Sequence, residues 1–104
     1  MNNNNRRATL FPKQKNALKI LGENIRLARK RRKLTQKLVS ERTGLSRVTL
    51  GKIEKGEGSV SIGHYQVVLG VLNLENDLSK VAQDDEFGRK IQDAALLKGH
   101  SNGN

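Results

Sequence analysis

The chain has 104 residues, the size of one small domain, and apolar residues make up 35% of it, which is low but sufficient for one compact core. Twenty Lys and Arg against ten Asp and Glu give a formal net charge of +10, which favours a polyanionic partner, nucleic acid first. The absence of Cys excludes disulfides, thiolate nucleophiles and Cys-based zinc sites. With only three aromatic residues we expect no large aromatic ligand pocket, and we expect no cofactor.

The first residues, 1–11, form a polar segment with an Asn run and no hydrophobic periodicity, and we expect a disordered N-terminal arm. Arg6 and Arg7 could reach a DNA groove as basic arms do, and the alternative is a merely solvated tail. A first helix is predicted from Pro12 to about Arg32. Its apolar positions recur with helical spacing at Leu18, Leu21, Ile25 and Ala28, flanked by Ile20 and Leu27.

Two short helices should follow, separated by a turn that contains glycine. Thr35 can cap the second helix, whose buried side is Leu38 and Val39, and Gly44 can end it in the left-handed conformation. Ser46 can cap a third helix, running from residue 47 to residue 55, with an inner face formed by Leu50 and Ile53.

Three further helical segments are predicted after Gly56. Ser61 can cap a fourth helix, and a short helix should lie around residues 75–82. A last amphipathic stretch spans residues 84–97, with Phe87, Ile91 and Ala94 or Ala95 on one stripe. The core side of the fourth helix is expected to carry Ile62, Tyr65, Val68, Leu69 and Leu72. No strand alternation is evident, so the fold class is all-α.

The stretch LTQKLVSERTGLSRVTLGKIEKG at residues 34–56 is the one specific motif in the chain. It resembles the helix-turn-helix of the XRE family, the lambda repressor-like DNA-binding domains. The resemblance implies a five-helix domain over residues 12–82 and a C-terminal tail over residues 83–104. Ser40 stands where the family usually has Ala, and because Ser is also small we expect little consequence.

The resemblance makes the third helix the recognition helix, whose first residues reach base edges in the major groove. Arg47, Val48 and Gly51 are then the base-reading candidates: Arg47 can fork to guanine, Val48 can contact a thymine methyl, and Gly51 permits close approach. The phosphate-binding candidates are Gln36, Ser46, Thr49, Lys52, Arg29, Arg31, Arg32 and Lys33. At the position of Gln36, family members bind a phosphate or brace a side chain of the recognition helix, and plain exposed polarity is the alternative. For Thr49 the alternative is a capping or purely exposed role.

The positive charge supports this placement because it is local. Residues 1–55 carry a net charge of +13 and residues 56–104 a net charge of −3. The densest basic cluster is residues 29–33, whose alternative role is a solvated helix end that complements the helix dipole. Concentrated basicity is typical of a nucleic-acid footprint.

The tail sequence DDEFGRKIQDAALL resembles that of HipB-type antitoxins, which pair with HipA-like serine/threonine kinase toxins and repress their own operon. This resemblance makes Phe87, Arg89 and Ile91 candidate dimer or partner contacts, unless the segment packs on its own domain. A homodimer on a pseudo-palindromic operator is expected. The alternatives are a stand-alone or phage-type repressor without a toxin, and an RNA-binding or architectural basic protein.

Enzyme and membrane functions are not favoured. His64 and His100 lack metal-ligand spacing, and no phosphate-binding glycine signature occurs. No apolar run is long enough to span a membrane, and the N-terminus lacks the apolar core of a secretory signal. We therefore expect a non-enzymatic, cytoplasmic, nucleoid-associated protein that binds no metal.

Overall fold

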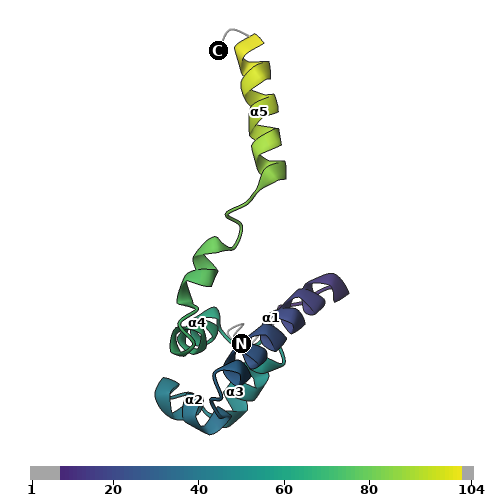
Figure 1. Cartoon of the computed structure of the whole chain (residues 1–104). Coiled ribbons are helices and arrows are strands. Elements are labelled where there is room, and N and C mark those ends of the chain that lie inside the picture. The colour runs from purple at the N-terminus through teal and green to yellow at the C-terminus, as the bar shows by residue number, and fades with distance from the viewer. Residues whose placement is uncertain (1–7, 102–104) are drawn as a thin grey trace.

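The structure is a computed structural model that describes residues 8–101, and every regular element in that range is a helix. Figure 1 shows the order: α1 (Pro12–Arg31), α2 (Gln36–Thr43), α3 (Arg47–Glu54), α4 (Ile62–Val71), the 3-10 helix η1 (Glu75–Lys80) and α5 (Glu86–Ser101). The predicted all-α, lambda repressor-like fold is confirmed. Arg6 and Arg7 of the expected N-terminal arm lie outside the described residues.

Side-chain caps begin three of the helices where the sequence predicts them. The hydroxyl oxygen of Thr35 accepts a hydrogen bond from the Leu38 amide at 3.1 Å. Ser46 accepts from the Thr49 amide at 3.0 Å, and Ser61 accepts from the His64 amide at 3.3 Å. Each bond satisfies an amide that has no partner within its own helix, and it fixes the residue at which the helix begins.

The turn from α1 to α2 is closed by a left-handed residue that is not glycine. Lys33 has a φ of 57°, and its amide donates to the carbonyl of Lys30 at 2.9 Å. The amide of Leu34 reaches back to the carbonyl of Arg29 at 3.2 Å. This paired pattern is a Schellman motif, and it ends α1 while directing the chain into α2.

The turn between α2 and α3 is fastened by two hydroxyl groups. Gly44 has a φ of 77°, the left-handed conformation that was predicted for it. Ser40 donates its hydroxyl to the carbonyl of Leu45. Thr43 Oγ1 donates to the carbonyl of Val39 at 2.8 Å and accepts from the Leu45 amide at 3.2 Å. Ser40 is therefore more than a small residue at a close crossing, because its hydroxyl holds the turn.

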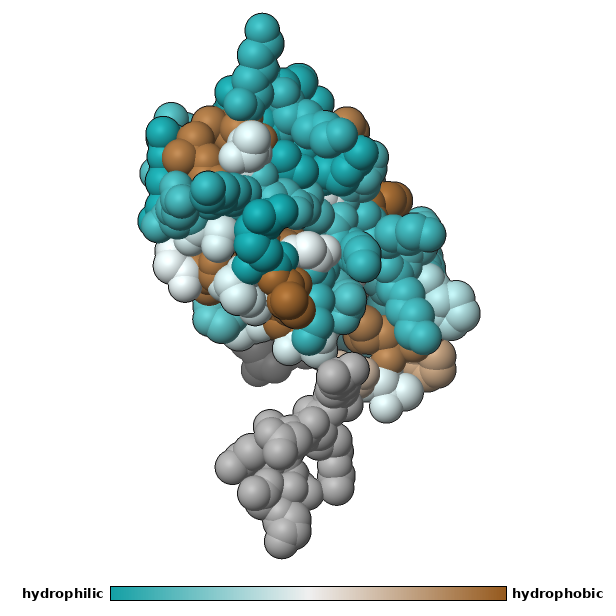
Figure 2. All heavy atoms as spheres, turned by 90° about the horizontal axis from the view of Figure 1, so that it is seen from below, coloured by the Kyte–Doolittle hydropathy of each residue, from teal (hydrophilic) through white to brown (hydrophobic). Residues whose placement is uncertain are grey.

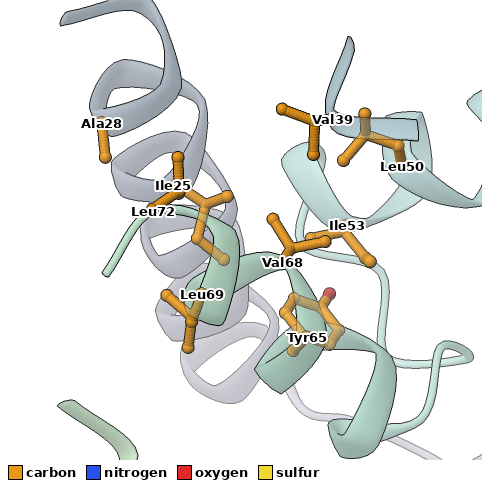
Figure 3. Close-up of a cluster of buried hydrophobic side chains, with 9 residues drawn as sticks. All are labelled: Ile25, Ala28, Val39, Leu50, Ile53, Tyr65, Val68, Leu69 and Leu72. Atoms are coloured by element: carbon orange, nitrogen blue, oxygen red, sulfur yellow. The ribbon is translucent and has the colours of Figure 1, made fainter. Parts of the chain in front are cut away.

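The core lies where α1 packs on α3 and α2 packs on α3 and α4. Figure 3 shows its buried side chains, Ile25, Ala28, Val39, Leu50, Ile53, Tyr65, Val68, Leu69 and Leu72. At the crossing of α1 and α3, a Cβ on Gly22 would lie 2.7 Å from the carbonyl oxygen of Ile53, so only glycine permits this approach. The predicted core position of Ile62 is wrong: its side chain is 71% exposed, because the first turn of α4 projects beyond the bundle.

The C-terminal part of the chain leaves the bundle. The short helix expected around residues 75–82 is the 3-10 helix η1, which buries no residue, and Ala82 follows it with a φ of 63°. Asp85 accepts a hydrogen bond from the Gly88 amide at 3.1 Å as α5 begins. In Figure 1, α5 stands clear of the bundle, and its residues from 86 to 98 are exposed, except for the half-buried Gly88.

Candidate nucleic-acid interface

The outer face of α3 presents the predicted base-reading residues. The buried face of this helix carries Leu50 and Ile53, which are fully buried. Arg47 is exposed in the first turn of the helix, and Val48, 69% exposed, points away from the buried face. A Cβ built on Gly51 would meet nothing within 4 Å, so the backbone of α3 is accessible there. The structure thus brings Arg47, Val48 and Gly51 together on one open helix face.

The first turn of α3 carries two hydroxyl groups that bond to each other. Ser46 accepts from the Thr49 amide and donates its own hydrogen to Thr49 Oγ1 at 3.1 Å. Ser46 therefore has no hydrogen to offer a phosphate in this arrangement, whereas the Thr49 hydroxyl keeps its own. Both predicted phosphate ligands lie at the start of α3, and Thr49 is the one equipped to donate.

A buried ion pair joins α1, α2 and α3 behind this face. Arg29 Nε donates to Glu54 Oε2 at 2.6 Å, and Arg29 Nη2 donates to Glu54 Oε1 at 3.0 Å. The third nitrogen, Nη1, donates to the carbonyl of Leu34 at 2.9 Å. Gln36 Nε2 completes the set by donating to Glu54 Oε1 at 3.0 Å. These bonds tie the end of α3 to the end of α1 and the start of α2.

The carboxylate of Glu54 is held in its charged form. Burial raises its pKa, but the hydrogen bonds from Arg29 and Gln36 and the charges of Arg29 and Arg26 lower it, and the net pKa lies below the ordinary value. A charged, bidentate pair of this kind is geometrically specific as well as strong. It therefore fixes the position at which the end of α3 meets α1.

The pair corrects one predicted site residue. Arg29 was expected to contact phosphate, but it is 8% exposed and all its guanidinium nitrogens donate within the bundle. It is a positioning residue for α3. Gln36, half-buried, has one amide hydrogen engaged by Glu54 and a second that remains for a phosphate.

The sequence contains a signal for this pair that helical spacing reveals. Leu50, Ile53 and Glu54 fall on the same face of α3, so an acid occupies a core-facing position. A buried carboxylate requires a cation, and Arg29 follows Ala28 on the inner stripe of α1. Charge counting treats Arg29 as one of five cations in a cluster and hides this difference.

The remaining cations at the end of α1 stay exposed. Arg31, Arg32 and Lys33 are all exposed, and Arg32 Nη1 donates to the carbonyl of Ala28 at 2.9 Å. Arg31 ends α1, and Arg32 and Lys33 lie between α1 and the cap of α2, so all three complement the carbonyl end of the α1 dipole. Lys52, half-buried on α3, lies one turn beyond Val48.

Figure 2, seen from below, shows a mostly hydrophilic face in which the apolar side chains form separate patches. A concave surface runs between α1 and α3, lined by residues that include Lys19, Arg26, Gly51 and Lys55. Within residues 8–101, no group of three or more His, Asp or Glu side chains is placed to hold a metal ion. None of the described helices is long and apolar enough to cross a membrane.

The predicted contact residues of the tail do not share one face. Phe87 and Ile91, one turn apart on α5, are 74% and 54% exposed. Arg89 lies on the other side of the helix, where its Nη2 is 3.0 Å from Asp84 Oδ1. The apolar stripe of α5 thus comprises Phe87 and Ile91 without Arg89.

Comparison with known proteins agrees with the geometry of the bundle. Residues 25–75 match the family described as helix-turn-helix. No curated protein and no solved structure gives a match. The match covers the end of α1, all of α2, α3 and α4, and the start of η1. The match supports an XRE-type helix-turn-helix over residues 25–75, a fold typical of DNA-binding transcription regulators.

Proposed function

We propose that the chain is a sequence-specific transcriptional repressor that reads its operator with α3. The observation that carries this proposal is the open face of Arg47, Val48 and Gly51, set on a helix whose inner side is buried and whose end is fixed by the Arg29–Glu54 pair. A reading helix must be held rigidly, because base contacts depend on angstrom-scale placement. Occupying a promoter is sufficient for repression.

The test compares Arg47→Ala with Arg42→Ala, a matched removal of one exposed arginine charge from α2. Footprinting of the DNA upstream of the gene first defines the operator. A bidentate arginine–guanine contact is worth about 1 to 3 kcal/mol of discrimination, so Arg47→Ala should reduce the ratio of operator to scrambled-DNA affinity by roughly 5- to 150-fold. Arg42→Ala should leave this ratio unchanged. An equal loss on all sequences after Arg47→Ala would instead indicate a nonspecific DNA or RNA binder.

The repressor is proposed to act as a homodimer that pairs through α5. No other described residue covers the apolar stripe of Phe87 and Ile91, and α5 is about 24 Å long, from 16 residues at about 1.5 Å each. Acids at residues 84–86 precede the helix and Lys98 lies near its end, so two antiparallel copies place opposite charges together. Pairing would let two α3 helices read a pseudo-palindromic operator.

Two matched variants on α5 test the pairing. Ile91→Asp places a charge on the apolar stripe, whereas Leu96→Asp places one on the opposite side of the helix at a comparably exposed residue, 64% against 54%. Sedimentation should show monomers for Ile91→Asp and dimers for Leu96→Asp. Ile91→Asp should bind the operator more weakly. Its binding curve should follow protein concentration as expected for a monomer and not for a dimer. Dimers of both variants would contradict the assignment.

The finer proposal is that the repressor is a HipB-type antitoxin that binds a HipA-like kinase and represses their shared operon. It is supported by the acidic, amphipathic tail sequence and by an α5 that leaves its apolar stripe uncovered. Co-expression with the neighbouring reading frame should yield a stoichiometric complex with a kinase, which Phe87→Asp weakens. Recovery of the chain alone would favour the stand-alone repressor.

A further inference from the structure

A concave basic surface joins the N-terminal half of α1 to the end of α3. Lys15 and Lys19 line it from α1, Lys55 lines it from the C-cap of α3, and Gly58 and Ser59 line it from the following loop. We call Lys15, Lys19 and Lys55 the lysine patch. None of its residues is among the predicted phosphate contacts, and Lys15 and Lys19 precede the segment that matches the helix-turn-helix family.

The fold builds the lysine patch by a close backbone approach. Gly56 has a φ of 73°, and a Cβ on it would lie 2.7 Å from the Cα of Lys19 and would also meet the carbonyl of Leu18. Only a residue without a side chain can pack there. Because Gly56 touches the backbone at Lys19, its neighbour Lys55 is brought beside α1 from a distant part of the chain.

The charges of the lysine patch are not neutralised within the described part of the chain. Lys15, Lys19 and Lys55 form no ion pair with any acid of residues 8–98. The acids that face the patch are Glu57, which lines the same concave surface, and Glu23, which is paired with Arg26 at 3.1 Å. Three cations against one unpaired acid leave a net positive surface, which costs folding free energy through repulsion.

The lysine patch lies on the same side of α3 as the base-reading residues. Val48, Gly51 and Lys55 follow at helical spacing, and Gly51, Lys55 and Lys19 line one continuous concave surface. Lys55 lies seven positions after Val48, which corresponds to about 10 Å along the helix axis. The major groove is about 12 Å wide, so a helix that reads bases near its start carries Lys55 to the rim, where phosphates run.

We infer that the lysine patch is a second DNA-backbone site, which binds the phosphates that flank the half-site read by α3. The inference rests on the proposed function, since it needs α3 in the major groove. It extends the footprint beyond the helix-turn-helix to the N-terminal half of α1. Compact ammonium groups suit this role because they bind phosphate oxygens as point charges without demanding one geometry.

The experiment compares the full-length chain with Lys15→Gln/Lys19→Gln and with Lys80→Gln/Lys90→Gln. The two double variants remove the same charge from exposed side chains, the first from the lysine patch and the second from η1 and α5. Affinities for the operator and for scrambled DNA are measured over a series of salt concentrations. Each lost phosphate contact makes the negative slope of log affinity against log salt shallower by about 0.9. The slope of the patch variant should therefore be shallower by up to about 1.8.

The expected result for the patch variant is a weaker affinity on both DNAs, an unchanged ratio between them, and loss of the outermost protected backbone positions in a hydroxyl-radical footprint. The control variant should keep the slope and the footprint of the unaltered chain. Equal changes in both variants, or none in the patch variant, would overturn the inference. If the unaltered chain did not prefer its operator, the proposed function would be overturned. If it did, but its footprint had no protected backbone positions outside those that the helix-turn-helix covers, only the second site would be refuted.

Discussion

Removing Arg29 should destabilise the domain more than the loss of any other single cation. Arg29→Met keeps an unbranched apolar stem but deletes the donors that hold Glu54 at 2.6 and 3.0 Å. The Glu54 side chain, 4% exposed, would keep only the hydrogen bond from Gln36. Leaving one member of a buried ion pair without its partner costs about 3 to 5 kcal/mol. Since small domains are stable by about 5 to 15 kcal/mol, much of the total would be lost.

A matched control lies one helical turn earlier on α1. Arg26 pairs with Glu23 at 3.1 Å, but the two side chains are 38% and 52% exposed. Breaking a solvent-exposed pair costs about 0 to 1 kcal/mol, so Arg26→Met should change stability little. The two variants remove the same group from the same helix, and the difference between them isolates burial.

Urea denaturation followed by helical circular dichroism measures both free energies of unfolding. The double variant Arg29→Met/Glu54→Met should cost less than the sum of the single changes, because no unpaired charge remains buried. Operator affinity should fall in Arg29→Met even where the domain is folded, since the end of α3 is no longer fixed. A loss for Arg29→Met within about 1 kcal/mol of that for Arg26→Met would refute the argument that this pair holds α3.

Four further substitutions test individual contacts in the structure. Gly56→Ala should abolish stable folding in thermal melts, because its Cβ would meet backbone atoms of Leu18 and Lys19, whereas Gly44→Ala should cost only about 1 to 2 kcal/mol, since nothing lies within 4 Å and left-handed strain alone opposes it. Because the pKa of Glu54 is lowered in the folded state, its carboxylate stabilises the fold at pH values above its unfolded pKa of about 4.3. This stabilisation is lost as the pH falls through the folded pKa. The free energy of unfolding should therefore fall less steeply with acid pH in Glu54→Gln than in the unaltered chain. Ser46→Ala should remove the cap of α3 and cost about 1 kcal/mol by chemical denaturation.

Local sequence signals were sufficient for the bundle helices. The caps at Thr35, Ser46 and Ser61 and the left-handed Gly44 act between residues close in the chain, so the sequence contains the whole interaction. Periodicity also located the inner faces. It failed at Ile62, because spacing gives the side of a helix and not how far the neighbouring helices extend along it.

The parts of the candidate interface that the sequence did not predict depend on contacts between residues distant in the chain. The Arg29–Glu54 pair spans 25 positions, and the lysine patch depends on Gly56 meeting the backbone of Lys19. Neither is visible in a count of charges, which gives all cations the same role. Whether α5 packs on its own domain could likewise not be predicted from the sequence. An amphipathic stripe identifies the apolar face of a helix but does not indicate which surface covers it.

The two halves of the chain differ in what their cations do, which says more than their net charge. Of the four cations after residue 55, Lys80, Arg89 and Lys90 each lie within 4 Å of an acid. Among residues 8–55 of the described structure, only Arg26 and Arg29 have such a partner. Mutual repulsion among the others opposes folding, so a positive surface of this density does not serve stability and is typical of proteins that bind a polyanion. Under the proposed function, the side of α3 that presents Arg47, Gly51 and Lys55 faces DNA, whose phosphates would supply the missing counter-charge.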